Sequence, residues 1–188
     1  MAISLLRKKF TVQTFAQMAE QGIFSPDERV ELLAGEIFEM GKIGRRHAAA
    51  VRRLLQILSR QVGEDQAWLD AQNPIALDDY SQPQPDLTLL RPRADAYEGG
   101  HPRPTDVLLL IEVADTTLES DRTVKIPLDA QGGISEVWLV DLNGQQVTAY
   151  RQPQADGYRL LQIYGAGDVV HPLAMPEVEV AIASLFPH

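Results

Sequence analysis

The chain has 188 residues, 45% of them hydrophobic, which is typical of one globular domain, and we predict a single domain over residues 1–188. Its formal charge of −9 argues against a protein that coats nucleic acid by bulk electrostatic attraction, although a local basic groove is compatible with it. The lack of cysteine excludes disulfides, thiolate metal ligands and thiol nucleophiles.

The start of the chain, MAISLLRKKFTVQTF, has a short apolar patch but neither the long apolar region nor the cleavage site of a signal peptide. No run of about 18 apolar residues occurs anywhere, so no membrane insertion is expected. Together with the absence of cysteine, this predicts a cytoplasmic protein.

Helical and extended patterns alternate through the first half. TVQTFAQMAEQG, residues 11–22, has apolar residues at helical spacing and predicts a short helix that stops at Gly22. A turn at 34–35 and a strand over 36–40 follow. The clearest helix is HAAAVRRLLQILSRQVG, residues 47–63, with an apolar face that we expect to pack against a sheet.

The second half is rich in strand patterns. A helix is predicted over Leu118–Gln131, ended by two glycines, and the closing segment 177–186 alternates before it turns apolar. Strands are predicted over 67–77, 85–91, 106–114, 136–142, 146–152 and 158–165, and the second and third are apolar runs of the kind buried on both faces. The pattern predicts an α/β fold, a mixed sheet flanked by helices with additional C-terminal antiparallel strands.

Three charged residues stand at informative places: Asp86 begins one apolar strand, Glu112 follows VLLL near the end of the next, and Lys125 lies on the helix after it. A buried ionised carboxylate is costly unless it is paired or binds a metal. Two carboxylates at one sheet edge suit Mg²⁺, or Mn²⁺ in its place, which keeps waters and accepts phosphate oxygens. A nearby lysine adds a cation, so the set describes phosphodiester hydrolysis.

These residues resemble the signature of the PD-(D/E)XK nuclease superfamily, Pro-Asp on one strand and Glu-X-Lys on the next. QPDLTLL supplies Pro85 and Asp86, and IEVAD supplies Glu112. The usual lysine would fall on the same strand face at position 114, where this chain has alanine. The sequence is similar to the large Uma-type family of restriction endonucleases, in which the lysine has migrated to the following helix, and Lys125 occupies that place.

The resemblance extends from FTVQTF to EVEVAIASLF, nearly the whole chain. It implies a restriction-endonuclease-like fold and DNA as the substrate, and it adds Glu31 of VELLAGEI to Asp86 and Glu112 as an acidic member of the metal site. The chain departs from the family at Asp129, where tyrosine is common, and at 132–133, where the helix usually ends less flexibly. A homodimer is expected, because cutting both strands of a duplex needs two sites related by symmetry.

Each of these residues also has a structural interpretation. Asp86 can cap the strand after a proline turn, and Glu112 can form an ion pair with Arg122 or Lys125. Lys125 taken alone is typical of a solvated helix residue. His47 opens the amphipathic helix, where a lone histidine is most often a cap or surface residue, and it is left out of the catalytic set.

Glu31 likewise has a structural alternative as a surface or capping residue. Two functions of different classes therefore stay open. The first is a magnesium-dependent DNA endonuclease, favoured by the joint presence of Asp86, Glu112 and Lys125. The second is a degenerate nuclease fold that serves as a nucleic-acid-binding or protein-interaction module, favoured by the acidic composition. A glycosidase is weaker, since no aromatic sugar platform accompanies the acids.

Overall fold

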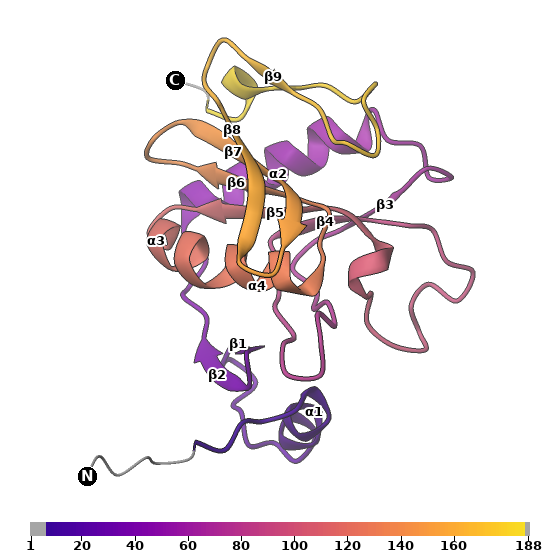
Figure 1. Ribbon diagram of the computed structural model, residues 1–188, viewed down its shortest axis with the longest axis vertical. Coiled ribbons are helices and arrows are strands. Elements are labelled where there is room, and N and C mark those ends of the chain that lie inside the picture. The colour runs from indigo at the N-terminus through magenta and orange to yellow at the C-terminus, as the bar shows by residue number, and fades with distance from the viewer. Residues whose placement is uncertain (1–6, 187–188) are drawn as a thin grey trace.

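The computed structural model describes residues 7–186 and is built around one six-stranded mixed sheet (Figure 1). The strand order is β3-β4-β5-β6-β7-β8. The pair β5–β6 is parallel and every other neighbouring pair is antiparallel. The strands are β3 Trp68–Asp70, β4 Leu87–Leu90, β5 Val107–Ala114, β6 Glu136–Asp141, β7 Gln146–Gln154 and β8 Gly157–Tyr164. This confirms the predicted mixed sheet flanked by helices.

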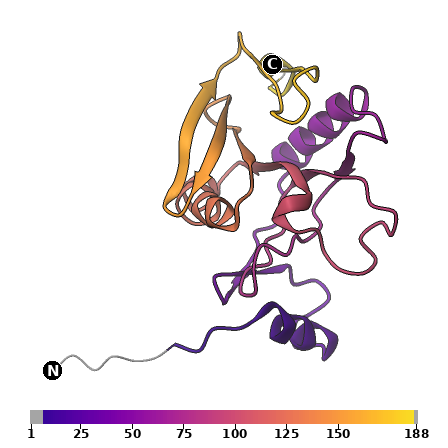
Figure 2. The ribbon, with the colours of Figure 1, turned by 45° about the vertical axis from the view of Figure 1, so that its right-hand side comes forward.

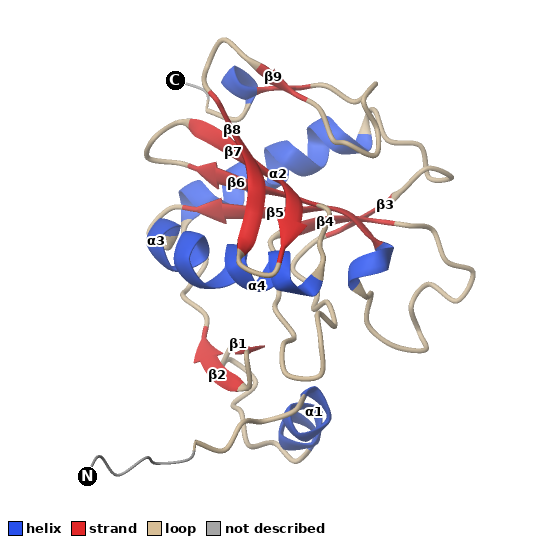
Figure 3. Ribbon diagram, in the orientation of Figure 1, coloured by secondary structure: helices blue, strands red, loops and turns tan. Residues whose placement is uncertain are grey.

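Helices cover both faces of the sheet (Figure 3). The long helix is α2 Arg45–Ser59, and the helical segment between β5 and β6 consists of α3 Leu118–Ser120, the π-helical turn η2 Asp121–Lys125 and α4 Ile126–Gly132. No helix among residues 7–186 is both long and apolar enough to cross a membrane.

The remaining elements are small and lie outside the main sheet. Helix α1 Val12–Glu20 and the hairpin of β1 Val30–Leu33 and β2 Glu36–Glu39 extend from one end of the molecule (Figure 2). A second two-stranded sheet pairs β9 Val169–Val170 with β10 Val180–Ala181. The 3-10 turns are η1 Pro104–Asp106 and η3 Ile182–Ser184.

Alternating residues of the central strands separate two hydrophobic cores, because successive side chains of a strand point to opposite faces. On β5, Leu109 and Ile111 join α2 and the C-terminal segment in one core, whereas Leu110 and Ala114 join α4 in the other. Strands β4 and β5 are buried on both faces, as their unbroken apolar runs predict. Glu112 on β5 therefore lies on the α4 side of a fully covered strand.

One predicted strand is shorter than expected. The segment 67–77 is extended only over Trp68–Asp70, since Gln72 takes a left-handed conformation (φ 57°) and Pro74 has no N–H to donate to a ladder. The closing segment 177–186 holds only the two residues of β10 and a 3-10 turn. The strand predicted over 67–77 was too long because breaks in the backbone decide where pairing stops.

The helix predicted over 118–131 is present but interrupted by the π-turn. Its regular α-helical part begins at Ile126, where Pro127 is tolerated because the first helical N–H groups need no partner. It ends at Gly133 (φ 85°), a left-handed cap that favours glycine. A Cβ on Gly132 would collide with the side chain of Leu77, so this glycine permits the close packing. The two glycines at 132–133, a departure from the family, therefore fit the helix end: one permits close packing and the other forms the cap.

Candidate active site

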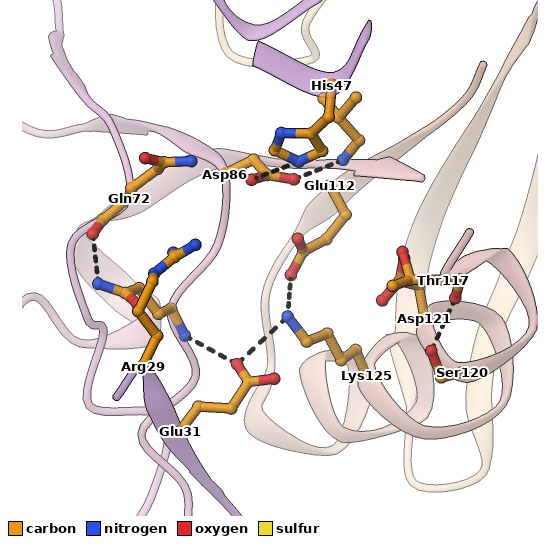
Figure 4. Close-up of polar contacts among 12 residues, drawn as sticks. Arg29, Glu31, His47, Gln72, Asp86, Glu112, Thr117, Ser120, Asp121 and Lys125 are labelled. Carbon is orange, nitrogen blue, oxygen red and sulfur yellow. Dashed lines mark hydrogen bonds and ion pairs between the residues drawn. The ribbon is translucent and has the colours of Figure 1, made fainter. Parts of the chain in front are cut away.

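A cleft of about 390 Å³ opens where β1, the approach to β4, the end of β5, η2 and the N-terminus of α2 meet. Figure 4 shows side chains from all five elements that point toward one another. The structure brings together Glu31, Asp86, Glu112 and Lys125, the four residues predicted from the sequence, and all four line the cleft.

Lys125 lies between two carboxylates. Its Nζ is 3.1 Å from Glu112 Oε1 and 3.2 Å from Glu31 Oε2, and its side chain is only 12% exposed. It is therefore not the solvated helix residue of the alternative interpretation, and it, not Arg122, is the partner of Glu112. Ala114, in the usual lysine position, is fully buried in the core.

The π-turn contributes to the placement of Lys125. A π-turn holds one residue more than an α-turn, and such turns occur mostly as single insertions, frequently at functional sites. The extra residue rotates everything after it by about 100° around the helix axis relative to a regular helix. Lys125 is the last residue of η2, so its direction depends on this irregular turn.

Asp86 is held by two donors from different elements. Its Oδ1 lies 2.9 Å from His47 Nε2, and its Oδ2 accepts a 2.8 Å hydrogen bond from the backbone N–H of Val113. The interpretation of His47 as a cap or surface residue is wrong, since its side chain is largely buried against Asp86. The sequence did hold one signal for this role. His47 is a titratable residue in the first turn of the helix that was expected to pack on the sheet.

Glu31 is positioned by the β1–β2 hairpin and by the segment that precedes Asp86. The backbone N–H of Gln84 donates to Glu31 Oε2 at 3.2 Å, and Gln84 Nε2 donates to the Gln72 carbonyl at 2.5 Å. Arg29 Nη2 in turn donates to Gln84 Oε1 at 3.4 Å. Glu31 is buried, against the interpretation of a surface residue. Gln84 is a supporting residue that the sequence analysis missed.

Two further acids lie beside this group. Asp121 of η2 accepts a 2.6 Å hydrogen bond from the Thr117 hydroxyl, and burial raises its pKa. Burial raises the pKa of Asp129 to about 8, and its Oδ2 has no hydrogen-bond partner among residues 7–186. The sequence suggested neither residue for the site, although Asp129 was noted as a departure from the family.

The electrostatics of the site are dominated by an excess of acid. Burial raises the pKa of Glu112 well above its usual range, with Lys125 acting in the opposite direction. Burial disfavours the ammonium of Lys125, but Glu112, Glu31 and Asp121 outweigh it and raise its pKa. One buried lysine is thus surrounded by more carboxylates than it can neutralise, and a further cation would relieve the excess.

Asp86 and Glu112 are the residues that could hold a Mg²⁺ ion in this cleft. Within the described part of the chain, no three acidic or histidine side chains are arranged to hold a metal ion by themselves. Mg²⁺ does not need such a cage, because it usually takes one or two carboxylates and completes its shell with waters and phosphate oxygens. Asp86 and Glu112 both line the cleft, and no residue of 7–186 donates a hydrogen bond to Glu112 Oε2.

Comparisons with known proteins identify the family and the fold. The model of a family described as "Uma2: Putative restriction endonuclease" matches residues 12–183. A crystal structure from Anabaena variabilis, described as a putative nuclease belonging to DUF820, superposes with a TM-score of 0.74 over 94% of this chain and 97% of that one, at 19% identity. At this identity the likeness concerns the fold. A comparison with curated protein sequences gives no match. From the match over 12–183, the chain belongs to the Uma2 family.

Proposed function

We propose that this protein is a metal-dependent endonuclease that hydrolyses phosphodiester bonds in DNA. The observation that carries the proposal is the arrangement of Asp86, Glu112 and Lys125 in one open cleft, with the lysine 3.1 Å from Glu112. An ion pair that served only stability would not need to line a cleft, whereas this one lines a cleft of about 390 Å³. Membership of the Uma2 family supports the same activity.

Each side chain has a role in this proposal. Asp86 and Glu112 hold Mg²⁺, or Mn²⁺ in its place, with Glu31 as a third acid beside them. When bound, the ion supplies a more acidic water and neutralises charge on the phosphate. Lys125 directs its ammonium at the charge that develops on the phosphate. Glu31 holds Lys125 in position at 3.2 Å, and His47 fixes the orientation of the Asp86 carboxylate at 2.9 Å.

The alternative is a degenerate fold that binds nucleic acid or protein without cleaving it. It is favoured by the charge of −9 and by the fact that Lys125 is already ion-paired. Against it, the three residues most needed for hydrolysis are all present and all reach the same cleft. The two functions differ in one measurable property, metal-dependent strand cleavage.

The test is cleavage of supercoiled plasmid and of circular single-stranded DNA, with and without Mg²⁺ or Mn²⁺. The variants are Glu112→Gln, Lys125→Met and Glu119→Gln, the last a matched control on an exposed residue of α3. We expect metal-dependent cleavage by the wild type and the control, and a loss of about 100-fold or more in the first two variants. Equal cleavage by wild type and Glu112→Gln, or no cleavage of either DNA, would refute the proposal.

A homodimer of single-domain subunits is part of this proposal. Strand β8 is an edge of the main sheet, and it carries the exposed apolar side chains Leu160, Leu161 and Ile163. Exposed edge strands with apolar residues tend to pair with another chain. A second copy joined along β8 would cover part of this apolar surface. Light scattering of the wild type and of Leu161→Lys, which should be monomeric, tests this prediction.

A further inference from the structure

Three exposed apolar side chains surround the charged residues of the cleft. Phe38 on β2, Ile43 on the loop that joins β2 to α2, and Val124 of η2 are each between 38% and 44% exposed. All three line the same cleft as Glu112 and Lys125. They belong to three different segments of the cleft lining.

Phe38 is tied to the acidic group by the hairpin. It is the direct cross-strand partner of Glu31 in the β1–β2 pair, so both side chains point to the same face. Directly opposed residues of antiparallel strands have Cβ atoms about 5 Å apart. Glu31 Oε2 is in turn 3.2 Å from Lys125 Nζ. Phe38 therefore lies on the same face of the hairpin as the carboxylate that binds Lys125, and all three residues line the cleft.

The charge of the cleft does not suit a continuous duplex. A duplex is held mainly by lysine and arginine contacts to its phosphates. Among residues 7–186, only Arg29, Lys42 and Lys125 supply such cations to the lining, and Lys125 is already paired with two carboxylates. The acids on the lining outnumber them and comprise Glu31, Glu39, Asp86, Glu112, Asp115 and Asp121. Binding energy must come from another source than bulk charge.

Stacking is that source. Every base has a π-face, and proteins that bind single strands combine cations along the backbone with aromatic platforms on which successive bases stack. The paired and stacked bases of a duplex cannot offer a face to a side chain. An exposed phenylalanine beside the phosphate position, flanked by aliphatic side chains, therefore complements an unpaired nucleotide.

We infer that the cleft binds single-stranded DNA, with one base stacked on Phe38 between Ile43 and Val124 and the adjoining phosphate at Lys125. The inference rests on the proposed function for the location of the phosphate. It goes further by assigning the class of substrate and by making Phe38 a substrate-binding residue.

Binding without cleavage tests the inference. We would measure fluorescence anisotropy, with EDTA present, of a labelled single-stranded oligonucleotide and of the same sequence as a duplex. The wild type should bind the single strand about tenfold more tightly. Phe38→Ala should lose about tenfold in single-strand affinity with duplex affinity unchanged, and Phe38→Trp should restore it. Phe38 is half exposed, so these variants should fold, which thermal melting checks.

Tyr80→Ala provides the matched control. Tyr80 is an exposed aromatic residue that does not line the cleft, so its loss should leave both affinities unchanged. The inference is overturned if the wild type prefers the duplex, or if Phe38→Ala and Tyr80→Ala behave alike. Single-strand binding that depends on Phe38 but without metal-dependent cleavage would leave the inference standing and refute the nuclease activity. Cleavage of duplex DNA alone, with a rate that Phe38→Ala does not change, would support the nuclease activity and refute the inference.

Discussion

Two buried glutamates on neighbouring parallel strands of the sheet have opposite surroundings. Glu136, at the start of β6, is fully buried and accepts hydrogen bonds from Arg151 Nε at 2.8 Å, Trp138 Nε1 at 2.9 Å and the Leu173 N–H at 2.6 Å. Glu112, on β5, has a single described partner, the Lys125 ammonium, which it shares with Glu31.

The difference separates a structural carboxylate from a candidate functional one. Both residues are acids within apolar strands, so burial alone does not distinguish them. Glu136 has donors on both oxygens and is sealed in the protein, whereas Glu112 lines an open cleft among further acids that raise its pKa together with burial. A carboxylate that the protein leaves short of donors at a cleft is the one suited to take a metal ion.

Removing Glu136 should cause the largest loss of stability. Glu136→Ala leaves the largely buried guanidinium of Arg151 without its carboxylate partner. Breaking a buried pair by removing one partner typically costs about 3–5 kcal/mol. Urea denaturation should show a loss of this size in the free energy of unfolding. A loss below about 1 kcal/mol would mean that the two glutamates do not differ in the way described.

The corresponding change at Glu112 should have little effect on stability. In Glu112→Gln the ammonium of Lys125 keeps Glu31 at 3.2 Å, and one unit of excess negative charge is removed. We expect the free energy of unfolding to change by less than about 1 kcal/mol, or to rise. The same urea titration at pH 7 measures it. Destabilisation as large as that of Glu136→Ala would make Glu112 a structural residue.

A third effect concerns the dependence of stability on pH. It extends the contrast between carboxylates that have hydrogen-bond donors, such as Glu136, and those that lack them. Burial raises the pKa of Asp129 to about 8. Between its usual pKa of about 4 and that value, the folded state keeps a proton that the unfolded state releases. Asp129 therefore adds stability at low pH that is lost as the pH rises to about 8, with a slope of up to about 1.4 kcal/mol per pH unit.

Asp129→Asn should flatten this part of the stability curve. Its free energy of unfolding should exceed that of the wild type most at pH 9 and least at pH 4, as measured by urea denaturation at several pH values. Glu136→Ala is the comparison variant, because Glu136 has hydrogen-bond donors on both oxygens. This variant should keep the same slope of stability against pH as the wild type. A slope in Asp129→Asn equal to that of the wild type would contradict the assignment.

The smallest expected effect is the salt dependence of DNA binding. Arg29 and Lys42 are the cations of the cleft lining not paired with an acid among residues 7–186. Two phosphate contacts predict a shallow plot of log K against log salt, with a slope of about −1.4 for a single strand, since each contact adds about −0.7. Anisotropy at several salt concentrations measures it. A slope that implies eight or more contacts would contradict the acidic character of this cleft.

The sequence identified the acidic residues of the site more readily than the residues that contact them in the fold. Asp86 and Glu112 were visible because a charge within an apolar run conflicts with burial, a local signal. Glu31 came from the family resemblance, since 94 residues separate it from Lys125, its partner in the ion pair. His47 was left out because a position in the first turn of a helix does not by itself show that the side chain reaches Asp86.

The fold likewise has parts that the sequence predicted and parts that it did not. Continuous apolar runs predicted β4 and β5, and the amphipathic face predicted α2. The π-turn that orients Lys125 left no periodic signal, because one inserted residue disturbs the helical period only locally. The stop of β3 depends on the conformation of Gln72, whose backbone N–H donates to the Asp86 carbonyl.

Calorimetric titration with Mn²⁺ tests most directly whether Glu112 is a metal ligand and not a structural partner of Lys125. We predict binding of the order of millimolar or tighter to the wild type and to Glu119→Gln, a loss of at least about tenfold in Glu112→Gln, and retained or tighter binding in Lys125→Met, since a repelling ammonium is removed. Absence of binding to the wild type, or equal binding by Glu112→Gln, would contradict the account.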